Sequence, residues 1–253
     1  MAIDKNSTGF TLTFVVIMVV IVGSVLASLA FGLKPLQKAH EADKKRMDII
    51  GAIGVDEVGD GEEKERLSRA NINEVFSDYV SGYYLLDNNG KVTSTDQKAV
   101  FAVDIKKQHR NTELTEDEKK FPLYTAKTDD GIEVFIVPMV GKGLWGPIWG
   151  YVAMEKDMKT IFGAKFDHKT ETPGLGAEIK TDFFQKNWAG QELDITANAK
   201  MMFEVTKGSG SSLGKHQVDG ITGGTITSKG VQEMVNRTML VYRKYESSTA
   251  QLN

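Results

Sequence analysis

The sequence predicts an α+β protein with a single N-terminal transmembrane helix, followed by a mixed α/β soluble region whose sheet is largely antiparallel. Three observations lead to this class. An uncharged apolar stretch covers residues 10–33. Asn-Gly and Asp-Gly turn signals separate the short apolar runs that follow, which favours hairpins over βαβ units. Near the C-terminal end, apolar residues recur at helical intervals.

Residues 10–33 carry no charged side chain, and about 20 apolar residues are enough to cross the hydrocarbon core of a bilayer. The stretch is longer than the roughly 7–15 apolar residues of a signal peptide, although small residues at 27–30 leave cleavage open as an alternative. We therefore predict an uncleaved membrane anchor, preceded by a short tail at residues 1–9.

The charges that flank this anchor favour a cytoplasmic location for the rest of the chain. Lys5 precedes the apolar stretch, whereas five Lys and Arg residues follow it between residues 34 and 46. Basic residues are enriched on the cytoplasmic side of membrane spans. The rule is weaker here because a long domain follows and because three of these residues, 44–46, lie ten or more positions from the anchor.

Residues 34–53 should continue as a helix, because their apolar residues fall on one stripe between charged ones. Glycines between positions 51 and 61 then interrupt the chain. Residues 62–80 again show helical spacing. Thr115 and Glu118 match the two ends of a capping box, which predicts a short helix there.

Turn signals set the expected strands. Two hairpins are predicted, around Asn88-Asn89-Gly90 and around Asp129-Asp130-Gly131. We expect strands at residues 83–87, 91–95, 123–126, 132–140, 148–154, 161–166 and 201–205. We also expect a short helix at 175–186, a Gly/Ser loop at 207–214 and a terminal helix at 229–246.

Composition narrows the possible functions. The 253 residues are 41% hydrophobic and 26% charged, with a net charge of -3 that does not suggest nucleic-acid binding. The absence of cysteine excludes disulfides, cysteine-ligated metals and thiol catalysis. No histidine has a metal-ligand spacing to an acidic residue, and no general acid–base pair is recognisable. We therefore predict no metal site and no catalytic residue.

The most informative candidate site is the run Thr222-Gly223-Gly224-Thr225, directly before a helical pattern. Glycines allow close backbone approach to a ligand, and the N–H groups of a first helical turn attract anions. Hydroxyls, including that of Thr227, can bind phosphate oxygens or be esterified by phosphate, as Thr225 is placed to be. The alternative is an ordinary glycine turn before a capped helix.

Two further runs contain candidate ligand-binding residues. The first is residues 171–176, where a proline and two glycines could bring the backbone to the edge of a planar ring; the alternative is a plain loop. The second is residues 144–150, where Trp145 could stack on an aromatic ligand, whereas Trp149 is expected in the core. The candidates in the first run are Glu171, Thr172, Gly174, Leu175 and Gly176.

Three residues near the Gly/Ser loop complete the candidate set. Lys207, Lys215 and His216 precede the Thr222–Thr225 run and could neutralise a phosphate or a reduced ring. The alternative is that they are simply solvated side chains.

Taken together and in this order, these runs resemble the FMN-binding domain of the C subunit of the sodium-translocating NADH:quinone reductase. That family carries FMN as a phosphodiester on the last residue of a Ser/Thr-Gly-Ala-Thr run. Here the run ends at Thr225 and has Gly224 where alanine is usual. The resemblance makes Thr225 the attachment residue, and residues 145–150 and 171–176 resemble the flavin pocket of the family. Residues 33–37, after the single span, match as well.

The resemblance implies a role and partners. The chain would be a membrane-anchored electron-transfer subunit, relaying electrons within a Na⁺-pumping NADH:quinone oxidoreductase together with the other subunits. A flavin transferase would attach the FMN, using FAD and releasing AMP. Residues 121–253 would be the FMN-binding domain and residues 34–120 a juxtamembrane helix with an α/β subdomain. The family keeps its flavin domain on the periplasmic side of the bacterial inner membrane, against the charge count given above.

Two alternatives remain open from the sequence. The related G subunit of the Rnf complex shares the flavin motif, but it is usually shorter than the long region at 43–118 found here. A single-span extracytoplasmic sensor or ligand-binding module would also suit one anchor followed by an α+β domain. In that case the Thr222–Thr225 run would be a turn with no covalent partner.

Overall fold

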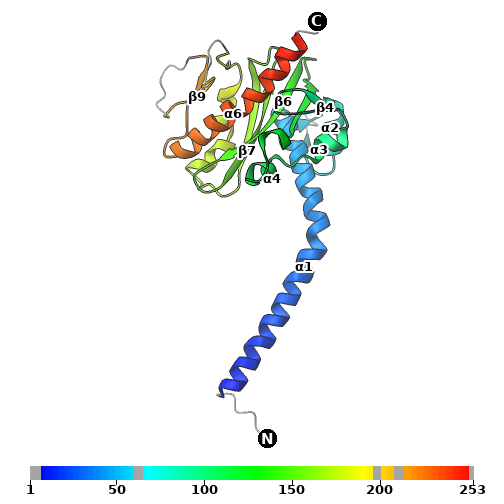
Figure 1. Cartoon of the computed structure of the whole chain (residues 1–253), viewed down its shortest axis with the longest axis vertical. Coiled ribbons are helices and arrows are strands. Elements are labelled where there is room, and N and C mark those ends of the chain that lie inside the picture. The colour runs from blue at the N-terminus through cyan, green and yellow to red at the C-terminus, as the bar shows by residue number, and fades with distance from the viewer. Residues whose placement is uncertain (1–6, 60–64, 196–200, 208–213, 251–253) are drawn as a thin grey trace. The chain divides into compact units, whose positions relative to one another are not determined.

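The computed structural model of the chain describes residues 7–59, 65–195, 201–207 and 214–250 (Figure 1). The chain forms two compact units, residues 1–45 and 46–253, and we describe each by itself. Helix α1 (Thr8–Gly51) begins in the first unit and ends in the second.

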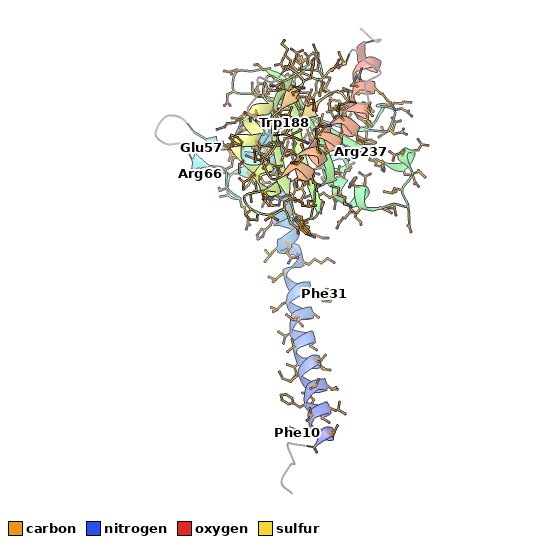
Figure 2. The ribbon with its side chains drawn as sticks, turned by 90° about the vertical axis from the view of Figure 1, so that its left-hand side faces the viewer. Phe10, Phe31, Glu57, Arg66, Trp188 and Arg237 are labelled. Carbon is orange, nitrogen blue, oxygen red and sulfur yellow. The ribbon has the colours of Figure 1, made fainter. Side chains whose placement is uncertain are left out.

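Helix α1 is one continuous helix of 44 residues, as the sequence predicts for the anchor and the segment after it. An 18-residue window within it has a mean hydropathy of 2.8, and none of that window is buried. Phe10 and Phe31 project from the helix in Figure 2, and Phe31 is 75% exposed. Among the described residues, this is the one helix that is long and apolar enough to cross a membrane.

The second unit is built on a six-stranded sheet in the order β4-β3-β5-β6-β7-β8, with every neighbouring pair antiparallel. This confirms the antiparallel sheet that the sequence predicts. Gly90 and Gly131 close the two expected hairpins with φ of 77° and 75°, values that disfavour any side chain. The strands are β3 (Val80–Leu86), β4 (Val92–Ser94), β5 (Phe121–Lys127), β6 (Glu133–Lys142), β7 (Pro147–Met154) and β8 (Ile161–His168).

The sheet separates two apolar cores because alternate residues of each strand face opposite sides. On β6, Val137 and Met139 join one core, whereas Ile136 and Val140 join the other. The first core lies under α6 (Thr225–Ala250), which crosses the sheet in Figure 1, and under the short helices η3 (Gly176–Lys180), α5 (Asp182–Gln185) and η4 (Lys186–Trp188). The second is covered by the last turn of α1 and by α2 (Ile72–Tyr79), α3 (Gln97–Ala102) and α4 (Ile105–Arg110).

Trp188 forms the centre of the core under α6. Its side chain is fully buried, and its ring lies 4.9 Å from that of Phe166 and 4.7 Å from that of Phe203, measured between centroids. In Figure 2 it sits within the packed side chains of the soluble unit. This aromatic cluster joins strand β8 to the segments that precede α6, and so supports the end of the sheet where the candidate residues lie.

Several elements differ from the sequence-based expectations. Helices α3 and α4 were not predicted, because six residues are too few to show a helical period. The helix expected at 62–80 begins only at Ile72; before it, β2 (Glu65–Arg66) pairs with β1 (Glu57–Val58). The strand expected at 201–205 is reduced to β9 (Glu204–Val205), which pairs in parallel with β10 (Gln217–Val218). Most of the expected loop at 207–214 lies outside the described residues.

Some boundaries between the expected parts also differ in the structure. Strands β3 and β4 belong to the same sheet as β5 to β8, so the division expected at residues 120–121 falls inside one sheet. The capping box of Thr115 and Glu118 is confirmed at the short 3₁₀ helix η2 (Glu116–Glu118). Helix α6 begins at Thr225, four residues earlier than expected, which makes Thr225 its first residue.

Candidate functional site

Thr225 stands exposed at the start of α6, where a tight turn delivers the chain into the helix. Gly223 takes a φ of 76°, and the N–H of Gly224 donates to the carbonyl of Ile221 at 2.9 Å. The hydroxyl of Ser228 accepts the N–H of Ile221 at 2.9 Å and so closes the turn against the helix. The first N–H groups of an α-helix have no partner inside the helix, so they remain available to an anion at this end.

A buried carboxylate joins the three runs that the sequence singles out. Glu171 is only 5% exposed. Its Oε2 accepts a hydrogen bond from the Thr227 hydroxyl at 2.6 Å, and its Oε1 accepts one from the backbone N–H of Trp145 at 2.8 Å. Both oxygens therefore bond to protein groups. The structure brings together the start of α6, the loop after β8 and the turn before β7 through one side chain.

Two glycines leave the space in which Glu171 sits. A Cβ on Gly143 would lie 2.5 Å from Oε1 of Glu171, which is well inside van der Waals contact. A Cβ on Gly176 would overlap both Oε2 of Glu171 and the hydroxyl oxygen of Thr227. These positions therefore require glycine for packing, whatever ligand binds nearby.

Apolar side chains surround this end of α6 but are not covered by protein. Leu144, Trp145, Leu175 and Ile226 are between 42% and 67% exposed. Leu175 lies directly against the turn, because its Cδ2 would be 2.7 Å from a Cβ on Gly223. Exposed apolar groups gathered beside an anion-binding helix start suit a ligand with a charged group and a flat apolar part.

The remaining residues of the 171–176 run form a turn held by its own hydrogen bonds. The carbonyl of Thr172 accepts the N–H groups of Leu175 and Ala177, both at 3.1 Å. Gly174 has a φ of 76°, and its N–H donates to Oε1 of Glu178 at 2.8 Å. Thr172 and Gly174 are exposed, whereas Gly176 is buried. This rigid turn holds Leu175 against the Thr222–Thr225 run.

The core position expected for Trp149 is confirmed. Trp145, two positions before β7 begins, is exposed. Trp149 is 9% exposed, and the ammonium of Lys106 lies 3.6 Å from the centroid of its ring. The two tryptophans therefore have different surroundings, and only Trp145 can contact a ligand at this site.

The structure does not bring Lys215 and His216 to this site. The ammonium of Lys215 donates to Glu192 at 2.8 Å, and Nδ1 of His216 lies 2.8 Å from the Glu192 carbonyl. Glu192 also pairs with Lys159, at 2.7 Å, in the turn between β7 and β8. Both strands are eight residues long, so that turn lies about 23 Å from the opposite end of the hairpin, where His168 and Glu171 lie.

Lys207 lies nearer to the Thr222–Thr225 run. It is exposed and follows Thr206, whose carbonyl accepts the N–H of Gly220 at 3.1 Å. Of the three basic residues predicted for the site, Lys207 is therefore the one that follows a residue hydrogen-bonded to the segment leading into the Gly223 turn.

The cluster around Glu192 is expected to lose stability in acid. Hydrogen bonds from Lys159 and Lys215 lower the pKa of Glu192 from 4.5 to about 2. A carboxylate whose pKa is lowered by folding stabilises the protein above its unfolded pKa, and this contribution disappears as the pH falls from about 4.5 towards 2. Over this window, the Tm of the unchanged chain should fall more steeply than that of Glu192→Gln. Equal slopes would contradict the assignment.

The structure adds residues that sequence reasoning does not select. Sequence patterns mark Gly143 only as part of a turn, and Ser228 only as one more hydroxyl in the run. Nδ1 of His168 accepts the N–H of Glu171 at 3.2 Å, which places the ring proton on Nε2, a buried atom without a hydrogen-bond partner among the described residues. No group of three or more metal-ligating side chains occurs within the described ranges.

Comparisons with known proteins agree with this geometry. The model of the FMN-binding domain family matches residues 143–239, from the glycine under Glu171 to the middle of α6. The C subunit of the Na(+)-translocating NADH-quinone reductase of Haemophilus ducreyi is 34% identical over 236 residues, covering 90% of this chain and 88% of that protein. The same subunit of Neisseria meningitidis serogroup B is 31% identical, with the same coverage of both chains.

A solved structure extends the likeness to the fold. The crystal structure of the C subunit of the Na(+)-translocating NADH-quinone reductase from Parabacteroides distasonis superposes with a TM-score of 0.70 at 33% identity, covering 85% of this chain and 97% of that one. Sequence and fold therefore agree along nearly the whole chain. The chain belongs to the family formed by the C subunits of the Na(+)-translocating NADH-quinone reductases.

Proposed function

We propose that this chain is the membrane-anchored, FMN-carrying electron-transfer subunit of a Na⁺-pumping NADH:quinone oxidoreductase, and that FMN is joined to Thr225 through a phosphodiester. The observation that carries the proposal is the junction at Glu171. One buried carboxylate accepts hydrogen bonds from the buried hydroxyl of Thr227, two residues after the exposed Thr225, and from the backbone N–H of the exposed Trp145, at one end of the sheet.

The residues present suit the two parts of FMN. The first N–H groups of α6 can bind a phosphate, and the exposed hydroxyl of Thr225 can be its ester oxygen. Thr222 and the backbone of Gly223 and Gly224 flank the same position. FMN, when bound, supplies the electron-accepting and electron-donating chemistry.

Other residues of the site have distinct roles in this proposal. Trp145 and Leu175 would hold the flavin ring by apolar contact, and Thr172, Gly174 and Lys207 would complete its surroundings. Glu171, with Thr227 and Gly176, holds these groups in place instead of touching the ring, because both of its oxygens already accept hydrogen bonds from protein. Lys215 and His216 are left out because they are anchored to Glu192.

Attachment would require a flavin transferase. The oxygen of Thr225 would attack the FMN phosphorus of FAD, the phosphoanhydride bond would break, and AMP would leave with the hydroxyl proton on its phosphate. A new ester bond then fixes the cofactor beside the partner subunits at high effective concentration. The chain needs no acid–base pair of its own, because it passes electrons and transforms no substrate.

We also propose that the apolar part of α1 anchors the chain in the bacterial inner membrane, with the flavin domain on the periplasmic side. The relatives are subunits of a complex, which supports other subunits as partners. Alkaline phosphatase fused after residue 253 should be active in cells, because this enzyme needs the periplasm to fold. A fluorescent green fluorescent protein fusion together with an inactive phosphatase fusion would place the domain in the cytoplasm and contradict this orientation.

The attachment is tested on the tryptic peptide of residues 216–229, isolated from native membranes. We expect its mass to rise by that of FMN less one water, and fragmentation should place the addition on Thr225. An addition on Thr222, Thr227 or Ser228 would show that this residue, and not Thr225, carries the FMN. An unmodified peptide in a protein that was made together with a flavin transferase would remove the covalent link and favour a simple ligand-binding domain.

A further inference from the structure

Strands β5 and β6 separate along half of their length. Their paired residues run from Tyr124 opposite Ile136 to Lys127 opposite Glu133, and Phe121 to Leu123 have no partner on β6. Pro138 lies in the part of β6 that does not pair with β5, and it has no N–H to offer that strand. The sheet is therefore open between the beginning of β5 and the second half of β6.

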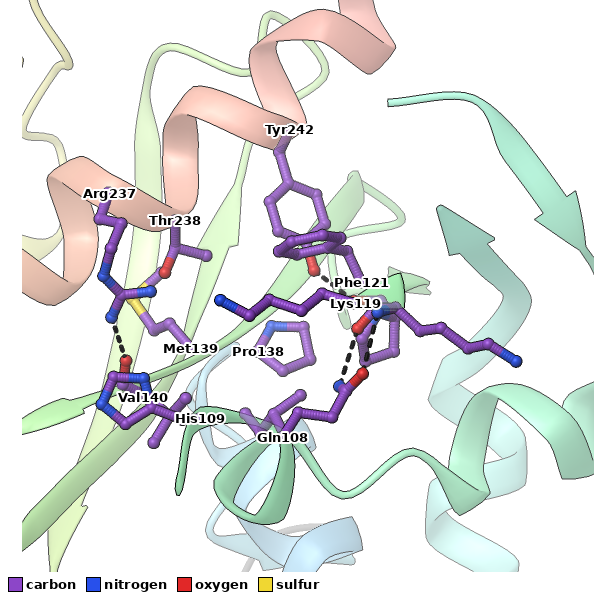
Figure 3. Close-up of a pocket in the computed structure, with 13 residues that line it drawn as sticks. Gln108, His109, Lys119, Phe121, Pro138, Met139, Val140, Arg237, Thr238 and Tyr242 are labelled. Carbon is purple, nitrogen blue, oxygen red and sulfur yellow. Dashed lines mark hydrogen bonds between the residues drawn. The ribbon is translucent and has the colours of Figure 1, made fainter. Parts of the chain in front are cut away.

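Side chains from the two flanking helices bond to the backbone groups that the opening leaves unpaired. The hydroxyl of Tyr242 donates to the carbonyl of Pro122 at 2.7 Å, and the guanidinium of Arg237 donates to the carbonyl of Val140 at 2.6 Å. On α4, the amide of Gln108 bonds both the N–H and the carbonyl of Lys120, at 2.9 and 3.0 Å. The opening is thus a built feature of the fold (Figure 3).

A cavity of about 50 Å³ lies in this opening and reaches solvent. It has room for about three or four water molecules, and hence for one small polyatomic ion. Its walls are largely apolar, from Phe121, Pro138, Met139 and Tyr242, with the rings of Phe121 and Tyr242 edge to face at 6.3 Å. These walls offer few hydrogen bonds, so the charged side chains at the rim decide what can bind.

Besides Lys120, whose backbone bonds Gln108, three basic residues from three different elements line the cavity. His109 comes from α4, Lys119 from the segment between η2 and β5, and Arg237 from α6. Figure 3 shows the side chains of Lys119, Arg237 and His109 directed to the same side of the cavity. Partial burial lowers the pKa of His109, and Arg237 and Lys119 lower it further against the opposing effect of Glu233, which is consistent with this proximity.

Two carboxylates accompany these cations, but both are exposed. Glu116 pairs with Lys119 at 2.5 Å, and Glu233 pairs with Arg237 at 2.6 Å. Their side chains are 72% and 56% exposed, and the solvent around such exposed carboxylates weakens their pairing with the cations. An anion placed between Lys119, Arg237 and the imidazole of His109 can therefore replace or supplement these carboxylates.

We propose that this cavity binds a small tetrahedral oxyanion, a phosphate or sulfate group, held by His109, Lys119 and Arg237. Donors that arrive from three elements surround a tetrahedral ion better than a planar carboxylate, and the cavity has room for one such group. The site is separate from the start of α6, because Arg237 follows Thr225 by twelve residues, about 18 Å along the helix. It does not depend on the proposed flavin.

The test is a titration of the full chain, in a phosphate-free maltoside detergent, with sodium phosphate against sodium chloride of equal ionic strength. We expect saturable heat with phosphate only. Lys119→Ala and His109→Ala should each weaken binding about tenfold, the effect of losing one hydrogen bond to a charged group. Lys107→Ala is the matched control. It removes a lysine charge, as Lys119→Ala does, but from α4, and Lys107 does not line the cavity.

A second readout does not depend on heat. The pKa of His109, followed by NMR, should rise when phosphate is added, because a bound anion favours the charged imidazole. A titration with short-chain phosphatidylglycerol identifies the source: tighter binding than phosphate, with the same dependence on Lys119, points to a lipid headgroup, and equal binding points to the free ion. Equal weakening in Lys107→Ala and Lys119→Ala, or an unchanged pKa of His109, would overturn the proposal.

Discussion

Thr225→Ala is expected to abolish all flavin that survives denaturation of the protein. Only this hydroxyl stands both exposed and at the first position of α6, where the helix start could hold the phosphate of the proposed ester. In-gel fluorescence after denaturing electrophoresis, on protein made together with a flavin transferase, should fall from full to background. Thr225→Ser keeps the oxygen and should retain a measurable share.

The matched control for this experiment is Thr222→Ala. It removes an exposed hydroxyl from the same turn, three residues away, and should leave the fluorescent band in place. Because the Thr225 side chain is exposed, its loss should change the Tm by at most about 2 °C. Fluorescence that persists in Thr225→Ala would show that another residue carries the cofactor.

Glu171→Ala is expected to be the most destabilising single change at the site. It leaves a buried donor, the hydroxyl of Thr227, and a partly buried donor, the N–H of Trp145, without acceptors. An unsatisfied buried group costs about 1–3 kcal/mol and the partly buried one costs less, which gives roughly 2–5 kcal/mol in all. For a domain of this size, we expect the Tm of the full chain in detergent to fall by roughly 5–20 °C.

Glu171→Gln separates hydrogen bonding from charge. The Gln oxygen can still accept from Trp145, and its amide can donate to the hydroxyl of Thr227, so most of the stability should return. Glu178→Ala is the control, because it removes a carboxylate that accepts one backbone N–H, that of Gly174, in an exposed turn. A Tm loss in Glu178→Ala equal to that in Glu171→Ala would contradict the special role of Glu171.

The sequence predicts a good part of this architecture because much of its signal is local. Gly90 and Gly131 set hairpin turns whose φ values only glycine adopts easily, and the alternation of apolar residues on the strands then orders an antiparallel sheet. Helix α1 follows from its length and lack of charge. Helices α3 and α4 escape such reasoning because they are short, although Asp96 and Asp104 cap them as aspartates typically do.

The candidate site shows where local signals stop. The runs around Trp145, Glu171 and Thr225 could be selected, but nothing in the sequence says that the Glu171 carboxylate faces the protein instead of a ligand. That fact depends on a contact across 56 residues, between Glu171 and Thr227. Lys215 and His216 lie close to Thr225 along the chain and yet are anchored to Glu192. Nine or ten residues of extended chain can cover the length of the β7–β8 hairpin, so closeness in sequence does not place these residues at the site.

The early start of α6 has a consequence for biogenesis. Thr225 is the first residue of α6 in a structure in which Thr227 is docked on Glu171 and Ser228 closes the turn. A modifying enzyme that recognises this surface would meet it only on chains that have already folded. The covalently bound flavin that we propose would then be added last, and its presence on a chain would show that the chain had folded.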